Sequence, residues 1–198
     1  MNKLLITIPM HADDAPRAEA LCDWIYQLNG RTPLGHVFLA YAHDVHEEMK
    51  MRLRISAELA FETVTEATPI AAPEMPGRFG AINHLFIQAA KQISRFSKFP
   101  WLWLEPDSVP LERGWQRLIF DAYENQPKLY FGSFLAFKVK ERDKRCLSRM
   151  AIYPNSAAGD LVSFCNQKEI GFNVPAGEFI VPRSKKTSLF QQLHVVDE

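Results

Sequence analysis

The stretch Trp101-Leu102-Trp103-Leu104-Glu105-Pro106-Asp107 determines how the fold is interpreted. Four large apolar residues in a row are typical of a central strand that is covered on both faces. Pro106 cannot continue a hydrogen-bond ladder, so it turns the chain out of the sheet directly after this strand. The sequence therefore predicts a buried strand that delivers two carboxylates, Glu105 and Asp107, to the edge of a sheet. These acids either bind a ligand there or form a solvated turn in which Asp107 caps the next segment.

Strands and helices alternate on both sides of this stretch. Apolar runs and helical spacing predict strands over 4–8, 36–42 and 62–70, and helices that end near 28, 60, 96 and 123. Beyond residue 124, strands are predicted over 129–139, 150–153 and 170–181, with only loops between them. This order predicts an α/β fold in one unit: a mostly parallel sheet flanked by helices, with a β-rich C-terminal part.

Composition excludes several classes of protein. Of 198 residues, 47% are hydrophobic, which is enough for a sizeable core and argues against disorder. Lys+Arg and Asp+Glu both number 23, so no overall positive field exists to hold a polyanion. The cluster Arg183, Lys185 and Lys186 is either solvated surface or a contact for a diphosphate or a nucleic acid.

The chain shows no sign of export or membrane insertion. Its early apolar run, 4–8, is too short for a signal peptide, and no later run approaches the roughly 20 apolar residues of a membrane span. Its three cysteines are widely spaced and form no metal or redox motif, so they are expected to pack as small apolar residues. We expect a cytoplasmic protein.

Three motifs in order carry a family resemblance. They are Gly80-Ala81-Ile82-Asn83 at the start of an apolar helix, the segment 101–111 with its Glu-Pro-Asp, and Gly114-Trp115. Together with Leu5-Ile6-Thr7-Ile8-Pro9, this order resembles the nucleotide-sugar-binding half of the GT-A-fold glycosyltransferases, over about residues 4–123. The resemblance implies a single GT-A-like (Rossmann-like) domain over 1–198. In it, about 1–123 bind the donor and about 124–198 face the acceptor.

The resemblance also implies an activity and a set of donor contacts. The chain would move a sugar from a nucleotide-diphosphate sugar to a hydroxyl of a glycan or a modified nucleic-acid base, in a bacterial or phage setting. Asp107 would bind Mn²⁺ or Mg²⁺, and Glu105 would contact the ribose or a metal-bound water. Glu105 departs from the aspartate of the family, which lengthens that arm by one methylene. Pro9 and His11 would contact the base and ribose, although a histidine in a loop is more often simply exposed.

Three further residues each have a binding and a structural interpretation. Asp44 either binds the base or caps a helix, and Arg78 either contacts the diphosphate or is a solvated loop arginine. Asn83 either contacts the sugar or holds its loop through backbone groups.

The C-terminal part contains the candidates for acceptor chemistry. In inverting relatives a carboxylate acts as general base, and Asp160 and Glu178 are the acids that lie beside glycines. Asp160 follows a predicted flexible loop over 155–159 that either closes over substrate or is a plain surface turn. His194 is either a late metal ligand or part of a frayed tail.

Two other functions compete with a transferase. A non-catalytic nucleotide- or glycan-binding module would keep the same architecture without turnover. A sugar-phosphate nucleotidyltransferase ranks third, because 9–14 read Pro-Met-His-Ala-Asp-Asp where that class has a glycine-rich basic loop. The chain is short for a complete transferase, which favours either a large acceptor or a partner subunit.

Overall fold

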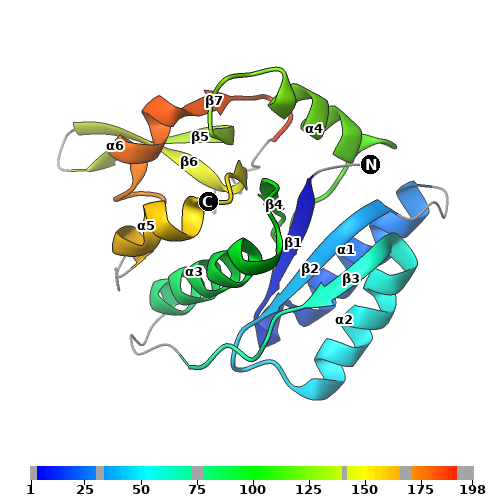
Figure 1. Cartoon of the computed structure of the whole chain (residues 1–198). Coiled ribbons are helices and arrows are strands. Elements are labelled where there is room, and N and C mark those ends of the chain that lie inside the picture. The colour runs from blue at the N-terminus through cyan, green and yellow to red at the C-terminus, as the bar shows by residue number, and fades with distance from the viewer. Residues whose placement is uncertain (1–3, 30–33, 73–77, 140–141, 166–170, 191–198) are drawn as a thin grey trace, which may run out of the picture.

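A computed structural model describes residues 4–29, 34–72, 78–139, 142–165 and 171–190. They form one seven-stranded sheet with the order β3-β2-β1-β4-β6-β5-β7 (Figure 1). The strands are β1 (Leu5–Met10), β2 (Leu34–Tyr41), β3 (Phe61–Glu66), β4 (Trp101–Trp103), β5 (Tyr130–Val139), β6 (Arg142–Tyr153) and β7 (Ser184–Lys186).

The sheet is mixed. The four strands β3, β2, β1 and β4 are all parallel to one another. Strand β6 is antiparallel to both β4 and β5, and β7 is again parallel to β5. The predicted α/β class, with a mostly parallel sheet that continues into further β structure, is therefore confirmed.

Helices cover both faces of the sheet. Figure 1 shows α1 (Ala15–Leu28) and α2 (Glu47–Ala60) side by side on one face, with α3 (Arg78–Phe96) and α5 (Ala157–Cys165) together on the other. The remaining helices are α4 (Trp115–Glu124), α6 (Gly177–Ile180) and two short 3-10 turns, η1 (Ala12–Asp14) and η2 (Val181–Arg183). None of the helices in the described ranges is long and apolar enough to cross a membrane.

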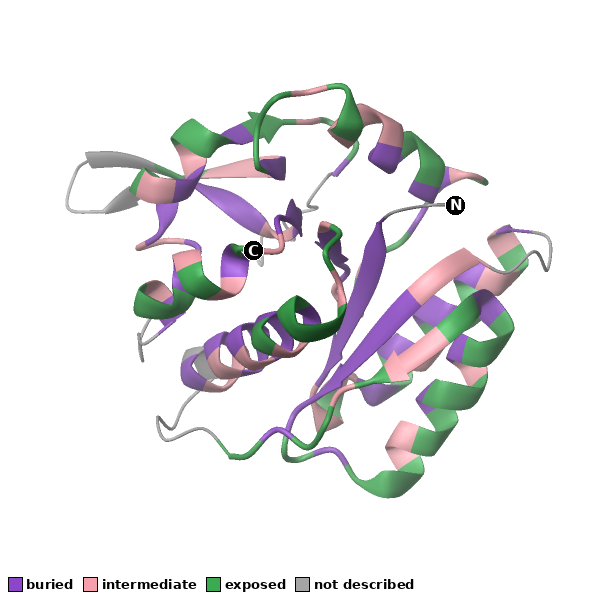
Figure 2. Cartoon of the chain, viewed as in Figure 1, coloured by how far each residue is buried: buried purple, intermediate pink, exposed green. Residues whose placement is uncertain are grey.

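An aromatic cluster joins α3 to the centre of the sheet. Phe86, only 1% exposed, stacks on Phe172 with ring centroids 4.1 Å apart. The same ring lies 5.4 Å from Trp101, 5.1 Å from Trp103 and 5.0 Å from Tyr153. Such ring pairs stabilise a core beyond simple burial of area. The predicted central strand is therefore covered as its sequence indicates, and Figure 2 shows buried residues along β1 and its neighbours.

The cysteines are confirmed as small core residues. Cys22, Cys146 and Cys165 are all buried free thiols. Burial raises the pKa of Cys22 to about 12, so it is a protonated, unreactive thiol at neutral pH.

Two predictions for the C-terminal part are wrong. Segment 155–159 is not a flexible loop, because helix α5 begins at Ala157 and the Ser156 hydroxyl donates to Asp160 Oδ2 at 2.8 Å. Residues 171–180 are turns and helix α6 rather than a strand. Insertion of Phe172 into the aromatic cluster outweighs the strand preference of this segment, and Ile170 lies outside the described residues.

The positions of the four tryptophans, on a strand and on helix faces, predict core packing for all of them, and this prediction is wrong for Trp24. Trp24 is 41% exposed, and its indole N–H donates to the Pro110 carbonyl at 2.6 Å. An indole with one apolar and one polar end is suited to this half-exposed position. Trp24 thereby ties α1 to the segment that returns from the Glu-Pro-Asp turn.

Candidate functional site

The order of the strands fixes where a ligand crevice should lie. From β1 the chain adds β2 and β3 on one side and then places β4 on the other side of β1. In open α/β sheets, ligands bind beyond the carboxyl ends of the strands where the order reverses in this way. The carboxyl ends of β1 and β4 are followed by His11 and by Glu105, respectively, so both residues lie at this position.

Glu105 is anchored from two sides. The backbone N–H of Leu104 donates to the Thr7 carbonyl at 2.9 Å, which extends the β1–β4 pairing to the residue before Glu105. From β6, Arg149 Nη2 lies 3.1 Å from Glu105 Oε1, and the two side chains are only 31% and 20% exposed. This half-buried ion pair fixes the carboxylate at the switch point of the sheet.

The pKa of Glu105 reflects this environment. Burial is the main cause and raises its pKa, while the positive charge of Arg149 opposes the rise. The negative charges of Asp107 and Asp14 raise the pKa of Glu105 further, and a hydrogen bond from Trp103 lowers it. Arg149 thus partly offsets the rise in the pKa of Glu105 that burial and the neighbouring acids cause.

Asp107 lies exposed at the end of the same turn. The turn is closed by the Ser108 N–H, which donates to the Glu105 carbonyl at 2.9 Å, and by the Ser108 hydroxyl, 3.0 Å from Met150 Sδ on β6. The Asp107 carboxylate has no hydrogen bond or ion pair with any residue that the structure describes. Within the described part of the chain, both of its oxygens are therefore without a partner.

His11 connects the β1 end of the site to the loop after β2. The Ala42 N–H donates to the Met10 carbonyl at 2.9 Å, and His11 Nδ1 lies 3.8 Å from Asp44 Oδ1. His11 Nε2 is buried and unpartnered within the described part of the chain. The loops after β1 and β2 thus bring the predicted residues His11 and Asp44 together.

Burial is the main cause that lowers the pKa of His11. Asp44 and Asp14 oppose this shift, whereas His43 and Arg149 add to it. Since Arg149 acts electrostatically on both His11 and Glu105, the two sides of the site form one charge cluster. It contains Asp14, Asp44, Glu105 and Asp107 against Arg149.

The donor set of this cluster fits a hard divalent cation. Mg²⁺ in nucleotide enzymes is held by one or two carboxylates and completes its shell with phosphate oxygens and water. No trio of His, Cys, Asp or Glu in the described ranges is placed to hold a metal by itself. Asp107 offers a free carboxylate and Glu105 lies beside it, so a metal here would depend on the substrate for its remaining ligands.

The other predicted donor-side residues occupy different positions. Pro9 is buried in β1 and is paired with Ala40. Asn83 is fully buried, and its Oδ1 accepts the Phe172 N–H at 2.9 Å, which corresponds to the structural interpretation of this residue. Arg78 is the first residue of α3, and its side chain lies outside what the structure describes. Asp44 lies before α2, whose cap residue is His46.

Two of the three predicted acceptor-side residues lie on described helices, Asp160 on α5 and Glu178 on α6. Asp160 is in the first turn of α5, where its Oδ2 accepts from Ser156 and from the Tyr130 hydroxyl at 3.3 Å. Glu178 is exposed in the first turn of α6. His194 lies outside the described residues.

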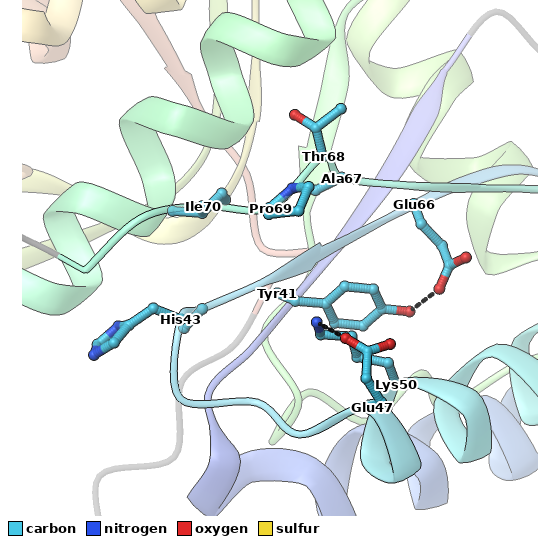
Figure 3. A pocket seen from close by; sticks show the side chains of 10 residues that line it. Tyr41, His43, Glu47, Lys50, Glu66, Ala67, Thr68, Pro69 and Ile70 are labelled. Atoms are coloured by element: carbon cyan, nitrogen blue, oxygen red, sulfur yellow. Dashed lines mark hydrogen bonds and ion pairs between the residues drawn. The ribbon is translucent and has the colours of Figure 1, made fainter.

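Sequence reasoning missed a polar cavity of about 300 Å³ beside this site (Figure 3). It lies at the carboxyl ends of β2 and β3, where Tyr41 donates to Glu66 at 2.8 Å and Lys50 pairs with Glu47 at 2.6 Å. The lining residues are Tyr41, Ala42, His43, Glu47, Lys50, Glu66, Ala67, Thr68, Pro69 and Ile70. The sequence could have indicated this cavity, because polar residues follow β2 and β3, two neighbouring strands whose carboxyl ends meet at the same edge of the sheet.

A comparison with solved structures identifies the fold. The galactosyltransferase LgtC, in complex with donor and acceptor sugar analogs, is similar with a TM-score of 0.59. The match covers 91% of this chain and 72% of that chain, at 9% sequence identity. The chain has a GT-A-like fold. No family model matches this GT-A-like chain, and no curated protein matches it.

The GT-A-like fold confirms the fold that the resemblance of the motifs implied. The expected segments of that resemblance, 5–10 and 101–107, are neighbours in the sheet, because β1 pairs with β4 through Thr7 and Trp103. Arg149 was missed because only the antiparallel pairing of β6 with β4 brings it next to Glu105.

Proposed function

We propose that this chain is a glycosyltransferase that binds a nucleotide-diphosphate sugar at the carboxyl ends of β1, β2 and β4 and transfers the sugar to a hydroxyl. One observation carries the proposal: the His11–Asp44 pair, 3.8 Å apart, and the Glu105–Arg149 pair, 3.1 Å apart, lie beyond the carboxyl ends of neighbouring strands, where the strand order reverses. The likeness of the fold to a glycosyltransferase supports it.

Each residue of the cluster has a chemical role in this proposal. Asp107, with its free carboxylate, would hold Mn²⁺ or Mg²⁺, and such an ion neutralises charge that develops on a leaving diphosphate. Glu105, oriented by Arg149, would accept hydrogen bonds from the ribose or from metal-bound water. His11 and Asp44 would contact the nucleoside from the β1 side.

The transfer itself exchanges one bond for another. The bond between the sugar C1 and the diphosphate oxygen breaks, and a bond between C1 and the acceptor oxygen forms. The nucleoside diphosphate leaves with the electron pair, and the acceptor proton passes to a base. Asp160 and Glu178 remain our candidates for that base. Asp160 has one oxygen engaged by Ser156 and Tyr130, which leaves Oδ1 for a substrate.

The experiment that tests this proposal is ligand-dependent stability. Thermal unfolding is measured with UDP, GDP, CDP and TDP, each with and without Mn²⁺, for the wild type and for Asp107→Asn. A ligand at a hundred times its dissociation constant stabilises by about 2.7 kcal/mol. We expect one nucleotide to stabilise the wild type only with metal and Asp107→Asn not at all. Asp23→Asn, an exposed aspartate on α1, is the matched control.

A nucleotide response that needs no metal and survives Asp107→Asn would contradict the proposal. The competing function, a non-catalytic nucleotide- or glycan-binding module, is favoured by the engagement of Glu105 with Arg149, which leaves a single free carboxylate in the turn. Release of nucleoside diphosphate from a nucleotide sugar by the wild type, abolished in Asp107→Asn, distinguishes the transferase from this module.

A further inference from the structure

The zero net charge of the chain conceals two oppositely charged halves. Residues 1–125 contain twelve lysines and arginines against sixteen acids, whereas residues 126–198 contain eleven lysines and arginines against seven acids. The donor half is therefore net negative and the acceptor half net positive by equal amounts. Charge asymmetry between the halves of a chain is a signature of contact with a polyanion.

Four cations of the acceptor half gather at the outer edge of the sheet. Strand β7, drawn in red in Figure 1, is the last strand of the sheet and contains Lys185 and Lys186. Lys128 Nζ donates to the Pro182 carbonyl at 2.9 Å, which places its ammonium directly before Arg183. We call these four exposed residues, Lys128, Arg183, Lys185 and Lys186, the basic edge.

The basic edge contains more cations than the protection of an edge strand requires. Lysines on an edge strand discourage pairing with a second sheet, and Lys185 and Lys186 would suffice for that. Lys128 and Arg183 lie outside β7, and the Arg183 guanidinium is held over the Phe179 ring at 4.2 Å while it donates to the Phe179 carbonyl at 2.8 Å. Arg183 is thus fixed in place beside the strand.

The register of the sheet gives the distance from the basic edge to the donor site. Leu102 on β4 pairs with Ile152, Ile152 with Phe131, and Phe131 with Lys185. Three steps between strands, each about 4.8 Å, place Lys185 about 14 Å to the side of β4. A diphosphate held at Asp107 cannot reach that far, so the basic edge does not contact the leaving group of the donor.

We propose that the basic edge binds the sugar-phosphate backbone of a duplex nucleic acid, which presents a hydroxyl on one of its bases to the donor site. This inference rests on the proposed function, because it names the acceptor. Duplex DNA carries one negative charge per about 1.7 Å of its axis. A duplex of a few turns is therefore long enough to contact the four cations and to reach the donor site, and it offers phosphates along this whole length. The acidic donor half repels the same backbone, which restricts its contact to the β7 side.

The test measures binding without donor. The full chain is titrated against a fluorescein-labelled DNA duplex of about 20 base pairs, and anisotropy is recorded from 50 to 200 mM salt. Four phosphate contacts give a slope of log K against log salt of about −3.6, which is a loss of affinity of about 150-fold over this range. We expect Lys185→Gln/Lys186→Gln to reduce the slope to about −1.8 and Lys91→Gln/Lys98→Gln, on and after α3, to leave it unchanged.

Three results would overturn the inference. Two of them are the absence of duplex binding at 50 mM salt and an unchanged slope in Lys185→Gln/Lys186→Gln. The third is displacement of the duplex by polygalacturonate of equal charge, which would identify an anionic glycan as the ligand. The stabilisation of the same preparation by nucleotide and Mn²⁺ is measured in parallel. Nucleotide binding without duplex binding refutes only the acceptor, and duplex binding without nucleotide binding refutes the proposed transferase.

Discussion

Removal of either member of the Glu105–Arg149 pair should destabilise the fold by an amount that depends on the presence of the other. The charged atoms are 3.1 Å apart, and the side chains are 20% and 31% exposed. Pairs on the surface contribute up to about 1 kcal/mol, and loss of one partner of a fully buried pair costs about 3–5 kcal/mol. With burial between these limits, we expect a coupling free energy of about 1–2 kcal/mol.

A double-mutant cycle measures this coupling. Urea unfolding is recorded for Glu105→Gln, Arg149→Met and the double variant, and the coupling is the departure of the double variant from additivity. The pair Arg117–Asp121 is the matched control, because its atoms are 2.8 Å apart on α4 while its side chains are 71% and 45% exposed. Its cycle should give at most about 0.5 kcal/mol. Equal couplings in the two cycles would refute the reasoning that burial strengthens the Glu105–Arg149 pair.

Three further changes have definite expected outcomes. Burial lowers the pKa of His11 in the folded state below its ordinary 6.5, so as the pH falls the unfolded chain takes up a proton on His11 before the folded chain does. The free energy of unfolding should therefore decrease as the pH drops below about 6.5. The decrease should be smaller in His11→Gln, and urea unfolding at several pH values measures both. Phe86→Ala should cost about 3–5 kcal/mol in the same assay, and a loss below about 1 kcal/mol would contradict the aromatic core. Gly177→Ala should destabilise the fold, since a Cβ there would lie 2.4 Å from the Arg145 carbonyl oxygen. Gly159→Ala should stabilise the fold by about 0.5–1 kcal/mol, because this helical position in α5 has open space for a Cβ. Thermal unfolding measures both variants, and shifts of the same sign would contradict this contrast.

The donor half could be predicted from the sequence because its signals are local. Apolar periodicity defines each strand and helix between 4 and 123, and parallel strands place their carboxyl ends at one edge. That rule alone brings His11, Asp44 and Glu105 to the same region, which the structure shows. The turn at Glu-Pro-Asp was recognisable because a proline directly after a buried strand cannot continue the hydrogen-bond ladder, whereas the role of its two acids was left open between a binding site and a solvated turn.

The acceptor half could not be predicted in the same way because long-range contacts determine it. The residues 155–159 predicted a flexible loop, yet helix α5 begins within them and packs against α3. Phe172 has the preferences of a strand residue, but it enters the aromatic cluster and its N–H is accepted by Asn83, 89 positions earlier. Arg149 reaches Glu105 only through a register that no local pattern encodes.

The short junction between β4 and β6 has a mechanical consequence. The recorded pairing there comprises only Trp101 with Tyr153 and Leu102 with Ile152, although β5 and β6 pair over most of their length. His11 and Asp44 belong to the body on one side of this seam, and Arg149 belongs to the hairpin on the other. The rings of Phe86, Trp101, Tyr153 and Phe172 pack across this seam. The spacing between these charged groups is therefore maintained mainly by side-chain packing and only to a small extent by backbone pairing.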